Sequence, residues 1–161
     1  MLDSAIQVNL FLMQYCRTLV KDIPDERMAE QPHEGVNHPA WILGHLSLTG
    51  DGALGLLGVQ KSLPPEWATL FGRGSKPSTA RSTYPSKAEL LETVEQKYAK
   101  ARQKAAAATP ELLSQPNANA RLKETLPTSK DLVAFLLTGH LAGHLGQLSA
   151  WRRMIGLGPL F

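Results

Sequence analysis

Two histidines near the C-terminal end of the chain have the spacing of a metal-binding pair. His140 and His144 lie four residues apart, and a helix turns by about 100° per residue, so their rings share one face. Two imidazoles at this spacing can reach one cation at the ~2.0–2.1 Å that zinc-type coordination requires. The flanking glycines, Gly139, Gly143 and Gly146, predict that the backbone of a neighbouring helix approaches closely here. The pair therefore indicates a divalent-metal site on an inward helix face.

His45 supplies a third imidazole from an earlier helical segment, where it shares a face with Trp41. Three imidazoles on two helices leave coordination positions open for water or substrate, which is typical of a reactive metal site rather than a closed structural one. The alternative is that His45, His140 and His144 are hydrogen-bonded core residues, which is the usual role of a histidine on an apolar face. Trp41 and Gln147 lie near the histidine faces, and they either line the pocket or pack in the core.

The remaining histidines and the nearest acidic residue have structural explanations. His38 stands directly before Pro39, and proline suits the first turn of a helix, so His38 is predicted to be an N-cap. His33 is predicted to lie in a loop. Asp51 is rotated away from His45 on the same helix, which indicates a surface carboxylate or at most a partner of a ligand.

Four segments of helical periodicity must position these residues, and no segment alternates like a strand. The expected helices cover about residues 4–22, 38–58, 86–110 and 128–156. Ser4 with Gln7, and Ser86 with Glu89, have the spacing of capping boxes. The last helix is expected to run through both His140 and His144 without a break. The sequence thus predicts an all-α fold, a four-helix bundle, as one domain over residues 1–161.

A long segment, residues 59–85, connects the second and third expected helices. Connections of this length in a compact domain are usually functional loops or lids. The segment contains Trp67, Leu70 and Phe71, which favour a short helical turn at about 66–71 packed over one end of the bundle. We expect this segment to shape a substrate pocket, and residues 110–127 to form a second irregular connection.

The composition excludes several classes of protein. Of 161 residues, 43% are hydrophobic and 19% are charged, which is a globular balance. The net charge is only +3, and the basic residues are scattered, with Lys97 and Arg102 on a predicted solvated helix face, so no nucleic-acid partner is expected. No stretch approaches the ~20 apolar residues of a membrane span. Cys16 is predicted to be buried and inert, and the absence of a signal peptide predicts a cytoplasmic protein.

Two blocks of sequence resemble a known family. Residues 38–46, HPAWILGHL, and residues 139–147, GHLAGHLGQ, together resemble the DinB/YfiT-like superfamily of metal-dependent four-helix-bundle proteins, and the likeness extends over the whole chain in order and number of helices. The resemblance implies that His45, His140 and His144 bind one divalent metal ion, most often zinc or nickel, with water completing the shell.

The resemblance also implies a function. Related proteins include transferases that depend on low-molecular-weight thiols such as bacillithiol and mycothiol, and some of them have a glutamate where this chain has His140. The chain is thus expected to be a metal-dependent enzyme, a thiol S-transferase or a hydrolase, acting on a small molecule as a homodimer. Arg73, Lys76 and Arg81 are candidates to meet a carboxylate of a thiol cofactor, and no general base is evident. The alternative is a non-catalytic, metal-binding or stress-related dimeric bundle.

Overall fold

The computed structural model describes residues 1–160; Phe161, the last residue of the expected domain, lies outside the described residues. The described chain contains helices and no strand, which confirms the all-α prediction. Its long helices are α1 (Asp3–Val20), α2 (Pro39–Leu56), α4 (Lys87–Ala106), α6 (Ser129–Leu137) and α7 (Gly139–Met154). The shorter elements are α3 (Pro65–Phe71), α5 (Pro110–Leu113) and two 3₁₀ turns, Asp25–Arg27 and Arg81–Thr83.

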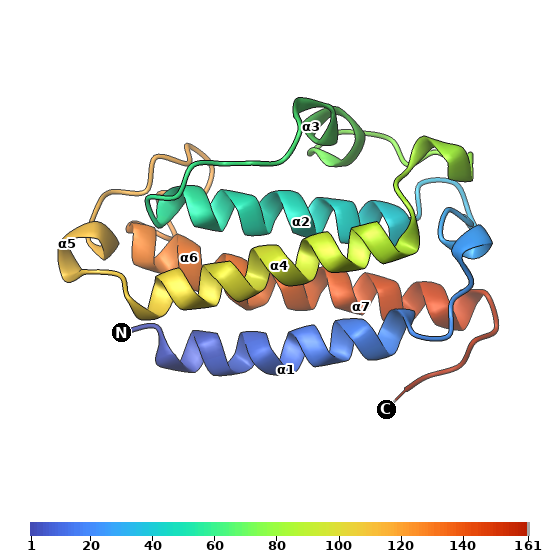
Figure 1. The fold of residues 1–161 in the computed structure, drawn as a ribbon, viewed down its shortest axis with the longest axis horizontal. Coiled ribbons are helices and arrows are strands. Elements are labelled where there is room, and N and C mark those ends of the chain that lie inside the picture. Colours follow the sequence, from blue (N-terminus) through green and yellow to red (C-terminus); the bar gives the residue numbers. More distant parts are fainter. Residues whose placement is uncertain (161) are drawn as a thin grey trace.

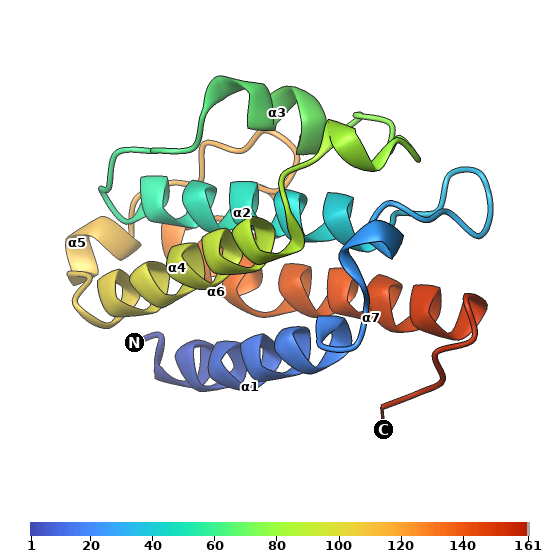
Figure 2. The same ribbon diagram turned by 45° about the vertical axis from the view of Figure 1, so that its right-hand side comes forward.

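The long helices lie side by side, with α6 and α7 following one another along one edge (Figures 1 and 2). α1 packs on α4 and α7, and α2 packs on α4, α6 and α7, so a continuous apolar core runs between them. Cys16 is buried in this core, as predicted, and burial raises the pKa of its thiol to about 12. No helix among residues 1–160 combines the length and apolar character that crossing a membrane requires.

Side-chain caps begin three of the long helices. His38 accepts a hydrogen bond from the backbone N–H of Trp41 at the start of α2, which confirms its predicted role as N-cap. Ser86 caps α4 through the N–H of Glu89, and Thr128 and Asp131 form a reciprocal capping box on α6. The predicted cap at Ser4 is wrong: α1 already begins at Asp3, and its N-cap position is Leu2, which has no side-chain cap.

The C-terminal helix is not continuous, contrary to the prediction. Thr138, with φ −127° and ψ −81°, separates α6 from α7. Its hydroxyl donates a hydrogen bond of 2.7 Å to the carbonyl of Ala134, a local bond that competes with the helix ladder. Next to the break, the Leu137 carbonyl accepts a 2.7 Å bond from Asn9 Nδ2 on α1. Side chains therefore satisfy carbonyl groups around the break, immediately before His140.

A buried ion pair fixes the segment that follows α2. Asp51 is 3% exposed, so the prediction of a surface carboxylate is wrong. Its carboxylate accepts a 2.6 Å bond from Lys97 Nζ on α4 and further bonds from the backbone N–H groups of Ser62 and Leu63. Lys97 therefore does not lie on a solvated face; it ties the beginning of the α2–α4 connection to the bundle.

The short helix α3, at the predicted position, covers one side of α2. Trp67 and Phe71 are its buried residues. The ring of Phe71 lies so close to the backbone of α2 that a Cβ added at Gly44 would come within 2.3 Å of it. Only glycine fits at this contact, which brings the backbone carbonyl of Phe71 to His45 on the second turn of α2.

Candidate metal centre

The structure brings His45, His140 and His144 together. His45 lies on the second turn of α2, and the other two lie on the first turns of α7. One ring nitrogen from each histidine lies within 4.8 Å of the other two. The Nε2 atoms of His45 and His140 are 3.4 Å apart, which matches the roughly 3.4 Å between two nitrogens that bind one tetrahedral ion at ~2.1 Å.

Hydrogen bonds fix the tautomer of two of the rings. His45 Nδ1 is 2.7 Å from the carbonyl oxygen of Phe71, which can only accept, so Nδ1 carries the proton and Nε2 presents a lone pair. His144 Nδ1 is 3.0 Å from Oε1 of Gln147, and Asn37 Nδ2 donates to the same oxygen. Oε1 is therefore the acceptor, and Nε2 of His144 is likewise unprotonated.

His140 completes the donor set and leaves one polar atom unsatisfied. Its Nδ1 is buried and has no hydrogen-bond partner among residues 1–160. Its Nε2 faces the unprotonated Nε2 of His45 across 3.4 Å. Two or three imidazole lone pairs thus converge on one point, an arrangement that a cation stabilises. The residues present therefore fit a divalent ion of the zinc or nickel type.

Burial holds the three imidazoles in the neutral form that binds metal. Desolvation lowers the pKa of His45. Desolvation and the neighbouring histidines lower the pKa values of His140 and His144 to about 4. All three rings are consequently unprotonated at neutral pH and need not lose a proton to coordinate an ion.

Aromatic rings border the centre, and a large pocket opens beside it. The ring of Trp41 stacks on that of His45, with centroids 4.8 Å apart, and the ring of Phe135 meets that of His140 edge-on at 5.8 Å. The pocket has a volume of about 760 Å³ and is lined by all three histidines. An ion held by these histidines would therefore keep a side accessible to a small molecule.

Both irregular connections contribute to the pocket wall. Arg73, Gly74 and Ser75 come from the α2–α4 connection, as expected, and Ser75 Oγ accepts a 2.8 Å bond from Trp41 Nε1. The wall formed by residues 117–122 was not predicted. In the sequence, this wall is recognisable only as a polar stretch between Pro116 and Pro127. Such a stretch does not indicate which part of the bundle it lies against.

Other candidates lie away from the centre. Arg81 forms an ion pair with Asp25 and also donates to the carbonyls of Tyr84 and Pro85, so it is a structural residue rather than a cofactor contact. His33 lies exposed in the connection between α1 and α2, as predicted. The expected close helix approach at the glycines is wrong: within the described chain, no atom of a neighbouring helix lies within 4 Å of a Cβ built on Gly143 or Gly146.

A family model of the DinB superfamily matches residues 13–148 of the chain. The chain therefore belongs to the DinB superfamily, and the resemblance of residues 38–46 and 139–147 is confirmed. The match includes all of α2 and the part of α7 up to residue 148, and thus all three clustered histidines. Among curated proteins, none matches the chain.

Proposed function

We propose that residues 1–161 form one DinB-type four-helix bundle, with residues 59–85 as its long connection, that binds a divalent metal ion through His45, His140 and His144. The protein uses this ion as an enzyme of the thiol S-transferase or hydrolase type on a small molecule. One observation carries the proposal: ring nitrogens of the three histidines converge on one point beside an open pocket.

The chain's own residues supply binding and orientation. The Phe71 carbonyl and the Gln147 amide hold the ring N–H groups of His45 and His144, which aims both Nε2 atoms at the centre. Trp41 and Phe135 cover the flanks of the rings and limit access of water from those sides. When bound, a divalent ion supplies Lewis acidity, which turns a thiol or a water molecule into a nucleophile near neutral pH.

The test is elemental analysis of the untagged protein together with His45→Ala and His144→Ala variants. We expect near-stoichiometric zinc or nickel in the unchanged protein and its loss from both variants. His33→Ala, which changes an exposed histidine outside the centre, is the matched control and keeps its metal. An unchanged protein that contains no metal and takes up neither zinc nor nickel would refute the proposal, and the three histidines would then be core residues.

Turnover separates the enzyme from its alternative, a non-catalytic dimeric metal-binding bundle. We expect the metal-loaded protein to transfer a low-molecular-weight thiol to an electrophile, or to hydrolyse a small ester or amide, and the His144→Ala variant to do neither. Dimer formation is supported by apolar side chains on the outer face of α1, where Phe11 is 57% exposed and Val8 and Leu10 are exposed as well. Light scattering of a Phe11→Glu variant tests it, and an unchanged molar mass would contradict pairing through α1.

A further inference from the structure

Two arginines with no partner line the pocket beside the histidines. Arg73 comes from the turn after α3, and Arg121 comes from the α5–α6 connection. Neither side chain makes a hydrogen bond or an ion pair within the described chain. Of the other arginines, four pair with carboxylates, namely Arg17, Arg27, Arg81 and Arg152. Arg102 donates to Asn9, whereas the exposed Arg153 has no partner in the described chain but lies outside the pocket. Two unpaired guanidinium groups thus line one and the same pocket.

The backbone that carries each arginine is fixed by hydrogen bonds. Ser75 Oγ accepts from Trp41 and donates to the Gly72 carbonyl, which holds the turn around Arg73 against α2. Asn117 is 4% exposed, and its Nδ2 donates to the Leu126 carbonyl, which closes the loop that contains Arg121. Both segments lie on the side of α2 opposite α1 (Figures 1 and 2). The charges thus extend from supported turns, which lowers the entropic cost of binding.

The rest of the pocket wall is apolar or neutral. Leu132, Phe135 and Leu136 of α6 form one side, and Leu56 of α2 forms part of the other. Among the described residues that line this pocket there is no aspartate or glutamate. A cation would meet two uncompensated positive charges here, whereas an anion would meet two guanidinium groups suited to a carboxylate or a phosphate.

We propose that the pocket takes a small amphipathic anion, whose carboxylate or phosphate head group pairs with Arg73 and Arg121 while its apolar body covers the leucines of α2 and α6. This inference rests on the proposed function, because the His45, His140 and His144 centre borders the same pocket and defines where the molecule reacts. The arginines recognise the charge of the substrate, and the leucines recognise its apolar part.

The test compares ligands with similar alkyl chains and different head groups, two of them anionic and one neutral. Binding of octanoate, octyl phosphate and 1-octanol is measured by calorimetry on the metal-loaded protein, on an Arg73→Ala/Arg121→Ala variant, and on Arg153→Ala, which removes an exposed arginine of α7 outside the pocket. We expect the better of the two anions to bind about tenfold more tightly than octanol, and this preference to disappear in the double variant but not in Arg153→Ala. Whichever anion binds more tightly identifies the head group.

Two results would overturn the inference. The anions and octanol could bind equally, or the double variant could keep the full preference, with its fold verified by circular dichroism. In the second case, loss of the preference on removal of the metal by a chelator would place the head group on the ion. Zinc uptake is measured on the same preparations, so that a failure of the metal centre is distinguished from a failure of anion recognition.

Discussion

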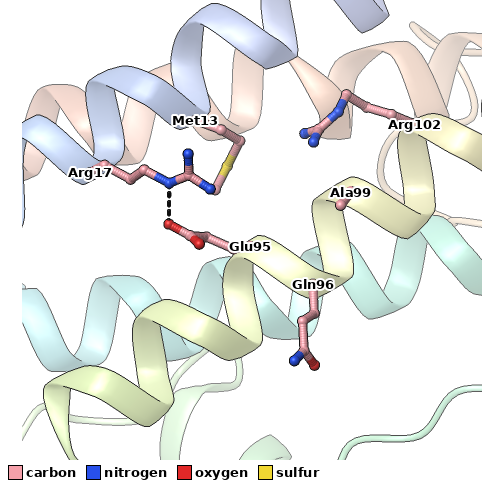
Figure 3. A pocket seen from close by; sticks show the side chains of 6 residues that line it. All are labelled: Met13, Arg17, Glu95, Gln96, Ala99 and Arg102. Atoms are coloured by element: carbon pink, nitrogen blue, oxygen red, sulfur yellow. Dashed lines mark hydrogen bonds and ion pairs between the residues drawn. The ribbon is translucent and has the colours of Figure 1, made fainter.

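Two hollows in the molecule are each lined by two arginines and differ in whether those arginines have partners. A hollow of about 240 Å³ lies between α1 and α4, and it is lined by Arg17, Glu95 and Arg102 among others (Figure 3). There Arg17 forms an ion pair with Glu95, and Arg102 Nη1 donates to Asn9 Oδ1 over 2.7 Å. Both arginines of this hollow therefore have a partner within the chain.

The pocket beside the histidines shows the opposite condition. Arg73 and Arg121 have no partner in the described chain, and neither does the buried Nδ1 of His140. The two arginines are exposed and water can hydrate them, but a buried polar atom such as His140 Nδ1 is usually hydrogen-bonded, and one that is not requires an explanation. The comparison teaches that an arginine beside a hollow does not by itself mark a site; guanidinium groups that line a pocket and have no partner in the described chain are the ones available to a ligand.

The largest expected effect is the stabilisation of the folded protein by zinc, which should depend on the histidine centre and not on the α1–α4 hollow. A zinc concentration about a thousandfold above the dissociation constant should raise the free energy of unfolding by about 4 kcal/mol, because only the folded chain gathers the three histidines. Urea unfolding with and without zinc measures this effect. The increase should vanish in His140→Ala and persist in Glu95→Ala, which changes the α1–α4 hollow. An equal increase in both variants would place the zinc elsewhere.

His38 provides a buried histidine whose nitrogens are both satisfied. Nε2 donates to the Ser78 carbonyl over 3.0 Å and Nδ1 accepts from Trp41, while burial lowers the pKa to about 4. The unfolded chain, with an ordinary pKa of 6.5, binds the proton first, so stability is complete above pH 6.5 and declines as pH falls towards 4. The loss from this residue is on the order of 3 kcal/mol, at about 1.4 kcal/mol per pKa unit.

His38→Asn tests this pH dependence, because asparagine keeps the N-cap and does not titrate. Urea unfolding of both proteins at pH 4.5 and pH 7 gives the comparison. Burial also lowers the pKa values of the three clustered histidines, but these residues remain in both proteins, so the difference between the two pH responses is due to His38. Identical responses would show that its protonation is not linked to folding.

Asn9 joins the two regions and should have the next largest effect. It is fully buried, accepts from Arg102 in the α1–α4 hollow, and donates to the Leu137 carbonyl beside the break that precedes His140. Asn9→Ala should lower the free energy of unfolding by about 2 kcal/mol, because it leaves a buried carbonyl without its donor. It should also weaken zinc binding. Gln7→Ala, on the exposed face of α1, is the control. If Asn9→Ala lowered stability and left zinc affinity unchanged, the helix break at Thr138 would not affect the metal centre.

Much of the centre could be predicted because its signals are local. The i, i+4 spacing of His140 and His144 and the capping role of His38 depend on helix geometry within a few residues, and each was placed correctly. The third member, His45, was found from the apolar stripe of its helix, since the side of a helix that faces the core is encoded by periodicity.

The features that could not be predicted depend on partners distant in sequence. The pairing of Asp51 with Lys97 joins α2 to α4, and a charged residue on a helix carries no sign that it will meet its partner. The break at Thr138 occurs within an apolar periodic segment that favours a continuous helix. Arg121 reaches the pocket only through the path of an irregular connection, which no periodic pattern describes.

Substitutions of Gln147 test how the ring of His144 is oriented, and their expected effect on zinc affinity is smaller. Its Oε1 accepts from His144 Nδ1, so Gln147→Ala should free the ring to rotate and should lower zinc affinity about tenfold. Gln147→Glu keeps an acceptor at this position and should retain the affinity or increase it. Zinc titrations against a competing chelator measure both variants. Equal affinities for the alanine variant and the unchanged protein would show that packing alone orients His144.

The smallest effect is expected in the hollow of Figure 3, where the charges are already paired. Arg17 is 59% exposed, and an exposed ion pair contributes about 0.2–1 kcal/mol, so the coupling energy between Arg17→Ala and Glu95→Ala should lie in that range. Neither substitution should alter zinc or octanoate binding. A coupling well above about 2 kcal/mol would contradict the expectation for an exposed pair. A change in octanoate affinity would mean that a paired arginine can also bind a ligand, and the distinction between the two hollows would then fail.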